Sequence, residues 1–270
     1  PKDAHYIQID IDGEEIGRNY EALRLAGDAR LALAALTEEL KKRDLTRRQA
    51  GRKALEDKIA AGHAKFLVGS EALRTSSRSP IRPERLMEEL APRLRSDDIV
   101  VADASYSSIW ISNYLVAEEV GQRFLTPRGL AGLGWGLPMA MGAKVGNPDK
   151  RIICLAGDGG FAHCWVELET ARRMGLAVTL MVLNNQILGY QKHAESLRFG
   201  MHTDAVDFEP VDHAAIARAC GLPGVRVERT EEIGPALDEA LANQSQTTLI
   251  DVMTDPDAHP PITLFEDLQN

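Results

Sequence analysis

Short apolar runs that alternate with segments of helical periodicity constrain the fold of this chain more than any other feature. Runs of strand length occur at residues 98–103, 151–157, 178–185 and 248–254, and helical patterns occur at residues 82–94, 132–146, 161–175 and 210–221. Strands that are apolar on both faces and separated by helices form parallel sheets with helices packed on both sides. We therefore expect an α/β fold built on a doubly wound parallel sheet.

The N-terminal part of the chain has a different character. Residues 5–12 alternate apolar and polar side chains as a strand does, and Asp28 is placed to cap a helix that follows it. Residues 41–65 are heavily charged and predict a solvated helix, and the stretch "RTSSRSP" has the composition of a linker. We expect one domain over residues 1–75 and a second over residues 76–270.

The composition argues against several classes of protein. The 270 residues carry 31 Lys and Arg against 40 Asp and Glu, a net charge of −9, and no basic stripe suited to nucleic acid. No run of about 18 apolar residues is available to span a membrane, and no signal peptide is visible at the start. Cys154, Cys164 and Cys220 fit no zinc-binding pattern. We expect a cytoplasmic protein with reduced thiols and no nucleic-acid or membrane partner.

Polar residues gather where the predicted strands end. Asp103, the sequence Gly157-Asp158-Gly159-Gly160, and Asn184-Asn185 each follow an apolar run. Ligands of such sheets bind outside the carboxyl ends of the strands. Glycine amides at the start of a helix favour a phosphate, but the nearby carboxylate would repel it unless a cation such as Mg²⁺ lay between them.

These strand ends together predict a metal-bridged phosphate or diphosphate site. Each piece alone is weak, because a Gly-Asp-Gly turn and an Asn-Asn loop are both common. Asp158 and Asn185 stand twenty-seven positions apart, with a whole helix and strand between them, and this spacing makes the combination more specific. Asn185 can supply a neutral carbonyl oxygen to the metal.

The same residues carry a resemblance to a known family. The pairing of Asp158 and Asn185, together with "GLAGLGWGLPMAMGAKVGNPDKRIICLAGDGGF", resembles the thiamine diphosphate enzymes of the acetolactate synthase, pyruvate oxidase and benzoylformate decarboxylase group. The resemblance covers residues 78–255 as a diphosphate-binding domain. Residues 4–40 are similar to the end of the family's Rossmann-like central domain.

The resemblance implies a set of metal and diphosphate ligands. The side chains of Asp158 and Asn185 and the backbone carbonyl of Ile187 would hold Mg²⁺. The amides of Gly159 and Gly160 would bind the diphosphate of thiamine diphosphate.

Four further residues match positions around the cofactor. Leu133 matches the bulky residue that holds the cofactor bent, and the Ala131 carbonyl would accept from its aminopyrimidine. Tyr106 and Ser107 match positions that touch the diphosphate from the opposite side. The alternatives are ordinary core packing for Leu133 and a plain loop for the other pair.

The implied activity is decarboxylation of a 2-oxo acid, followed by release of an aldehyde or addition to a second carbonyl. The family's glutamate for the pyrimidine ring lies in a separate, N-terminal domain that these residues do not contain. We expect an upstream segment or a partner subunit to supply that half, so that this chain alone is inactive, and we expect a homo- or hetero-oligomer. Most of the FAD site of flavin-containing relatives also lies upstream, which leaves FAD binding open.

The sequence departs from acetolactate synthases next to the expected site. Ala194 stands where those enzymes carry a Trp that selects the acceptor, and Tyr190, Gln191 and His193 are expected to line the channel instead. His193 is a candidate proton shuttle, with an ordinary surface histidine as the alternative.

Two other functions compete with this enzyme. The first is a non-catalytic or regulatory module that has kept the fold, against which the intact metal and diphosphate residues argue. The second is a nicotinamide-dependent dehydrogenase. Its glycine motif should follow a first strand, and Gly132, Gly134 and Gly136 follow no clear strand.

Overall fold

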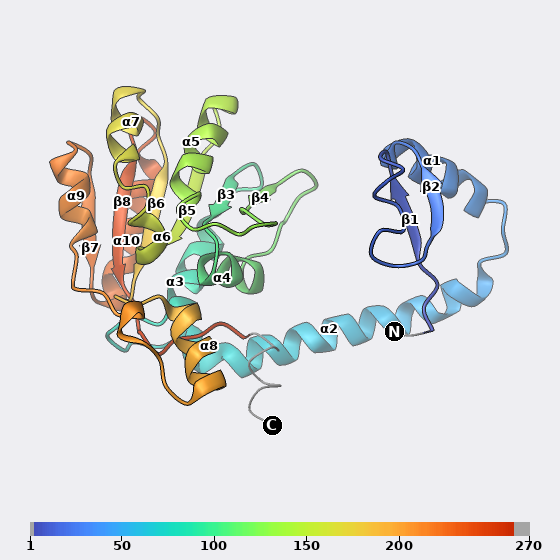
Figure 1. Ribbon diagram of the computed structural model, residues 1–270, viewed down its shortest axis with the longest axis horizontal. Coiled ribbons are helices and arrows are strands. Elements are labelled where there is room, and N and C mark those ends of the chain that lie inside the picture. Colours follow the sequence, from blue (N-terminus) through green and yellow to red (C-terminus); the bar gives the residue numbers. More distant parts are fainter. Residues whose placement is uncertain (1–2, 262–270) are drawn as a thin grey trace. The chain divides into compact units, whose positions relative to one another are not determined.

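The computed structural model describes residues 3–261, and the chain divides into two compact units. The first unit ends at Val68 and the second begins at Gly69 (Figure 1). That residues 1–75 are the end of a Rossmann-like central domain stays a prediction.

The first unit contains two strands and the helices that follow them. β1 (Ile7–Asp10) and β2 (Leu23–Ala26) pair in parallel. They precede α1 (Ala29–Leu40) and α2 (Thr46–Arg74), the latter of which continues into the second unit. The Asp28 carboxylate accepts from the Leu31 amide at 3.0 Å, so the predicted helix cap is confirmed.

The second unit is built on one parallel sheet of six strands in the order β4-β3-β5-β6-β8-β7. The strands are β3 (Ile99–Ala102), β4 (Arg123–Leu125), β5 (Ile152–Gly157), β6 (Thr179–Asn184), β7 (Gly224–Val227) and β8 (Thr248–Met253). This sheet confirms the predicted α/β class. The two edge strands, β4 and β7, were not predicted, since three or four residues are too few to show a period.

Helices cover both faces of the sheet, as Figure 1 shows. The helices and short 3₁₀ turns of this unit are α3 (Pro83–Leu90), η1 (Ala91–Arg93), α4 (Tyr106–Tyr114), α5 (Gly136–Gly146), α6 (Asp158–Phe161), α7 (Glu167–Arg173), α8 (Gly189–Phe199), η2 (Asp204–Val206), α9 (His213–Ala219) and α10 (Thr230–Ala242). α3, α4 and α10 pack on one face, and α5, α7 and α9 pack on the other.

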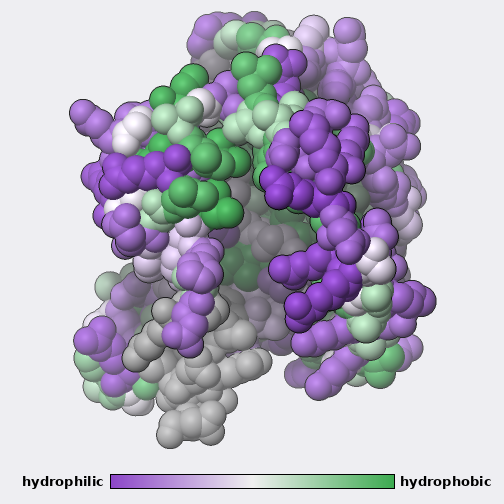
Figure 2. Space-filling model, turned by 90° about the vertical axis from the view of Figure 1, so that its right-hand side faces the viewer, coloured by the Kyte–Doolittle hydropathy of each residue, from purple (hydrophilic) through white to green (hydrophobic). Residues whose placement is uncertain are grey.

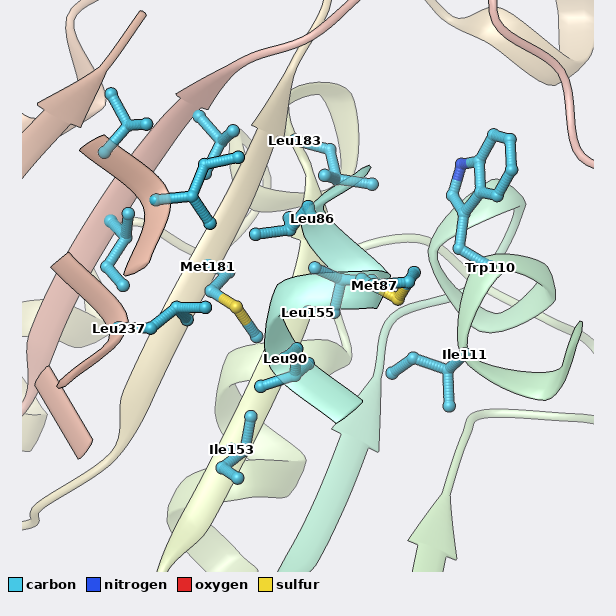
Figure 3. Packing of buried hydrophobic residues seen from close by; sticks show 14 of the residues in the cluster. Leu86, Met87, Leu90, Trp110, Ile111, Ile153, Leu155, Met181, Leu183 and Leu237 are labelled. Carbon is cyan, nitrogen blue, oxygen red and sulfur yellow. The ribbon is translucent and has the colours of Figure 1, made fainter. Parts of the chain in front are cut away.

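The central strand β5 shows how one sequence serves both faces. Ile153 and Leu155 point into the core under α3, α4 and α10, while Cys154 and Ala156 point into the core under α5, α7 and α9. Figure 3 shows the first of these cores, where the apolar side chains of α3 meet those of the strands. The continuous apolar runs follow from this two-sided burial.

The helix predicted over residues 161–175 is shorter in the structure, because α6 ends at Phe161 and α7 begins only at Glu167. Between them the backbone bonds with a spacing of three, as in His163 N to Gly160 O at 3.1 Å. The loop before α5 passes close by, since a Cβ built on Gly134 would lie 2.7 Å from the Cβ of His163. The sequence pattern does not reveal this crossing.

The order of the strands creates a switch point. From β3 the chain moves outward to β4, and it then returns to place β5 on the opposite side of β3. The segments that follow β3 and β5 therefore diverge, and a crevice opens at the carboxyl ends of these two strands.

Two further observations concern the apolar residues of the helices and of the surface. Within residues 3–261, no helix combines the length and the apolar character that crossing a membrane would require. Green, apolar side chains gather among purple, polar ones on the face drawn in Figure 2.

Candidate active site

A cavity of about 460 Å³ lies at the switch point. Its walls come from the segments after β3, β5 and β6 and from the Gly-rich loop, residues 129–136. The predicted site residues that line it are Tyr106, Ser107, Ala131, Leu133, Asp158, Gly159, Gly160, Asn185, Ile187, Tyr190 and Gln191. His193 is not among the lining residues. The roles of all these residues toward a metal or cofactor stay predictions.

Asp158 is the most constrained charged group of this cavity. Asp158 is the first residue after β5, and it is only 5% exposed. One oxygen accepts from the Gly159 amide at 2.8 Å and the other from the Gln186 amide at 2.6 Å. Burial raises its pKa to about 6, although these amides oppose the shift. No Lys, Arg or His in the described part of the chain forms an ion pair with it.

Backbone strain concentrates around the same cavity. Within residues 3–261, the non-glycine residues with positive φ are Ser105 at 65°, Ala131 at 51° and Gln186 at 60°. Ser105 and Ala131 line the cavity, and Gln186 donates its amide to Asp158. Left-handed backbone at non-glycine residues is costly, and it tends to cluster at functional sites.

Gly159 and Gly160 occupy positions where a side chain does not fit. A Cβ on Gly159 would lie 2.7 Å from Leu188 and 3.0 Å from the ring of Phe208, and one on Gly160 would overlap the carboxylate of Asp103. A side chain at either position would therefore have to displace these neighbours.

Asp103 does not take the place at the site that its position after β3 suggested. It is 1% exposed, and its oxygens accept from the amides of Gly134 at 3.0 Å and Trp135 at 3.2 Å. Asp103 therefore fixes the Gly-rich loop and does not line the cavity.

The two adjacent asparagines have different functions. Asn185 lines the cavity, and its side-chain oxygen accepts from the Ile187 amide at 3.3 Å. Asn184 is 1% exposed and donates to Asp251 and to the Val211 carbonyl, each at 2.9 Å. Successive strand residues point in opposite directions, so only one of the pair can face the cavity.

A buried polar network lies next to the two strand ends that carry Asp158 and Asn185. Asp251 is fully buried and accepts from the His213 amide at 3.0 Å as well as from Asn184. The His213 ring packs edge-on against Phe161, with 5.6 Å between ring centroids. This network connects the strand end at Asn184 with the turn that carries Asp158. Sequence reasoning missed it, because its members are far apart in the chain.

His193 lies behind Tyr106. The Tyr106 hydroxyl is 2.7 Å from His193 Nδ1, and the Tyr106 ring meets Tyr190 edge-on at 5.7 Å. Burial lowers the pKa of His193 to about 4, with further contributions from His259 and Lys192, while burial raises the pKa of Tyr106. At neutral pH the phenol is therefore protonated and the imidazole neutral, so the hydroxyl can donate to Nδ1.

Comparison with known proteins decides the family. The model of the thiamine pyrophosphate enzyme C-terminal TPP binding domain matches residues 103–252, which include every predicted cavity residue. The chain belongs to this family. Thiamine pyrophosphate is another name for thiamine diphosphate, so the predicted resemblance is confirmed.

Individual thiamine pyrophosphate enzymes are similar over most of this chain. Sulfoacetaldehyde acetyltransferase of Roseovarius nubinhibens is 30% identical over 97% of this chain and 46% of its own length. The acetolactate synthase isozyme 2 large subunit of Escherichia coli is 28% identical over 88% of this chain and 41% of its own. The chain thus spans less than half of these curated relatives.

A solved structure supports the fold. The thiamine diphosphate-dependent 4-hydroxybenzoylformate decarboxylase of Rhodococcus jostii RHA1 matches 67% of this chain and 34% of its own chain. The match has a TM-score of 0.62 and 27% identity.

Proposed function

We propose that this chain forms the diphosphate-binding half of the active site of a thiamine diphosphate- and Mg²⁺-dependent enzyme, which decarboxylates a 2-oxo acid and ligates the product to a second carbonyl as acetolactate synthases do. The observation that carries the proposal is the buried carboxylate of Asp158, which faces the cavity with backbone amides as its hydrogen-bond donors. Family membership and the acetolactate synthase relative support it.

The residues around Asp158 fit a hard cation bound to a diphosphate. Burial disfavours the charged carboxylate, and a divalent cation beside it would restore the charged form. The Asn185 side chain and the Ile187 carbonyl would add the neutral oxygens that Mg²⁺ accepts. The amides of Gly159 and Gly160 would hold phosphate oxygens, at a place where a Cβ would collide with its neighbours.

The remaining walls would orient the cofactor. Leu133, which is 37% exposed, would hold it bent, and the Ala131 carbonyl would accept from its amino group. Tyr106 and Ser107 would contact the diphosphate from the segment after β3. Bound thiamine diphosphate supplies the electron sink for breaking the bond to the carboxylate.

The rings of Tyr190 and Tyr106 line the cavity, and they would form its wall toward the substrate, with His193 behind Tyr106. His193 would keep the phenol of Tyr106 in place through the 2.7 Å hydrogen bond. The neutral imidazole can also accept a proton relayed through that hydroxyl. Exclusion of water by the rings would strengthen the charge interactions inside the cavity.

The proposed enzyme needs a second half. A pyrimidine-binding domain with its glutamate, on an upstream segment or a separate subunit, would complete the site in a homo- or hetero-oligomer in the cytoplasm. Most of the FAD site of flavin-containing relatives would also belong to the upstream half, which leaves FAD binding open.

A titration tests this function. The protein is purified with any chain that accompanies it, and thiamine diphosphate binding is followed through tryptophan fluorescence with and without Mg²⁺, since Trp110 lines the cavity. Asp158→Asn should weaken Mg²⁺-dependent binding by about 100-fold, because a charged partner of the metal is lost. Asp238→Asn, at an exposed helix position, is the matched control and should bind like the wild type.

The same titration can reject the proposal. If the wild type, together with its pyrimidine-domain half, binds no thiamine diphosphate in the presence of Mg²⁺, the proposal fails, and the chain is a non-catalytic or regulatory module or fragment that has kept the fold.

A further inference from the structure

Arg128 carries the positive charge of the cavity wall. Among the residues that line the cavity, Arg128 is the basic one, and Asp158 and Asp255 are the acidic ones. Asp255 is already paired with Arg82 at 3.2 Å. The Arg128 guanidinium donates to the Ser108 hydroxyl at 2.8 Å, and it forms no ion pair with any carboxylate of residues 3–261. An arginine without an acidic partner at a cavity suits an anionic ligand.

Arg128 is itself exposed, and the group that holds its guanidinium at the cavity is the buried Ser108. Ser108 is 3% exposed, and its hydroxyl donates onward to the Ser105 carbonyl at 2.9 Å. Ser105 itself has the strained φ of 65°. Pro127 precedes the arginine, and Gly129, with φ of 94°, turns the chain after it. A guanidinium tethered in this way loses less entropy when it binds a carboxylate.

We propose that Arg128 binds the carboxylate of the acceptor, the substrate that keeps its anionic group throughout the reaction. This inference rests on the proposed function. In carboligation, a bond forms between the donor's carbonyl carbon, after CO₂ has left it, and the acceptor's carbonyl carbon. The acceptor's oxygen takes up one proton, and its carboxylate is unchanged.

The donor carboxylate is a poorer ligand for Arg128. Its negative charge disperses as the bond to CO₂ breaks, so a cation held on it would stabilise the ground state more than the transition state. A retained carboxylate has the same charge in both states, and binding it carries no such cost.

The cofactor's diphosphate is the other anion available. Its proposed ligands Gly159 and Gly160 follow β5, whereas Arg128 belongs to the segment between β4 and α5. That segment also carries Ala131 and Leu133, the proposed contacts of the reacting end of the cofactor. The placement favours the substrate over the diphosphate.

A matched pair of acceptors tests the proposal. The enzyme, isolated with any chain that accompanies it, is assayed with pyruvate as donor and with 2-oxobutyrate or propanal, which lacks the carboxylate, as acceptor. Arg128→Met should lower kcat/KM for 2-oxobutyrate by about 10- to 100-fold and leave propanal within about 3-fold, as expected for loss of one charged hydrogen bond. Arg128→Lys should lie between. Arg123→Met, exposed on β4 and outside the cavity, is the control.

Equal losses for both acceptors, or a raised Kd for thiamine diphosphate, would overturn the proposal in favour of the diphosphate. A thermal-shift experiment separates this failure from failure of the proposed function, because it needs no turnover. Stabilisation by 2-oxobutyrate should be lost in Arg128→Met, while stabilisation by inorganic pyrophosphate with Mg²⁺ persists. No shift with 2-oxobutyrate in the wild type, or loss of the pyrophosphate shift alone, would contradict the proposal.

Discussion

The two units of this chain use similar local patterns and achieve different burial. In residues 3–68, Ile16 is the sole buried residue, and the apolar side chains of α1, such as Leu33 and Leu36, are 52% and 45% exposed. In residues 69–261, both faces of the sheet are covered, and Leu155 of β5 is fully buried. Helix caps and hydrophobic periodicity lead to helices and strands in both units. Much apolar surface is removed from water only in the second unit.

The difference explains where the candidate site can lie. Ser105, Ala131 and Gln186 have left-handed backbone, and Asp158 is a buried carboxylate. Such features cost free energy and persist only where the surrounding packing compensates for them. The second unit supplies that packing through its two cores, whereas Ile16 is the sole buried residue among residues 3–68.

The largest effect expected from this comparison concerns core leucines. Leu155→Ala should lower the free energy of unfolding by about 3 kcal/mol, because it removes a buried side chain and leaves a cavity in the core. Leu36→Ala, at an exposed position of α1, should change it by less than about 0.5 kcal/mol. Urea denaturation followed by circular dichroism measures both.

A comparable loss from Leu36→Ala would show that α1 is buried in the protein in solution. The division into one packed and one open unit would then be wrong.

A smaller effect is expected from the carboxylates. Asp251→Asn should cost about 2 kcal/mol, since Asp251 is fully buried and accepts from Asn184 and the His213 amide. If the proposed function holds, Asp251→Asn should also weaken Mg²⁺ binding, because its partner Asn184 directly precedes the proposed metal ligand Asn185. Asp10→Asn at the end of β1 is the matched variant, where the carboxylate accepts from the Asp12 amide on an exposed turn. Its cost should stay below about 0.5 kcal/mol.

Denaturation and Mg²⁺ titration of the two variants measure these effects. If Asp251→Asn and Asp10→Asn were equally stable, the buried network around Asp251 would not support the site.

The smallest effect concerns pH. The pKa of His193 is lowered to about 4 in the folded protein, so the unfolded chain binds a proton in the window between about 6.5 and 4 that the folded chain does not. Stability should therefore fall as the pH drops through this window, by about 1 kcal/mol between pH 7 and 5 after allowance for the solvent contact that remains. His193→Gln should remove this part of the pH dependence.

The check is denaturation of both proteins at pH 7 and pH 5. The histidines of the first unit, His5 and His63, are exposed, and His63→Gln serves as the control. A pH dependence unchanged by His193→Gln would mean that this imidazole is solvated.

The sequence alone predicts the parallel sheet and the strand ends that meet at the candidate site. Apolar runs at residues 151–157 and 178–185 indicated strands buried on both faces, and hence a parallel sheet. Parallel strands end at one edge, so Asp158 and Asn185 were expected together, and the structure places both on the wall of one cavity. Local hydrogen-bonding rules placed the cap at Asp28. All of these are properties of short segments, or of segments whose direction is known.

The partners of the polar side chains depended on which segments of the chain pack together in the folded protein. The orientation of Asn185 toward the cavity and Asn184 toward Asp251 follows from the register of β6, which neighbouring strands set. Asp103 turned toward the Gly-rich loop, and His193 lies behind Tyr106, eighty-seven residues away in the chain. The hydrogen bond of Arg128 to Ser108 likewise joins two segments with no shared pattern. Short-range periodicity determines the elements and their ends, whereas the partners of each polar side chain depend on strand order and on the packing of distant loops.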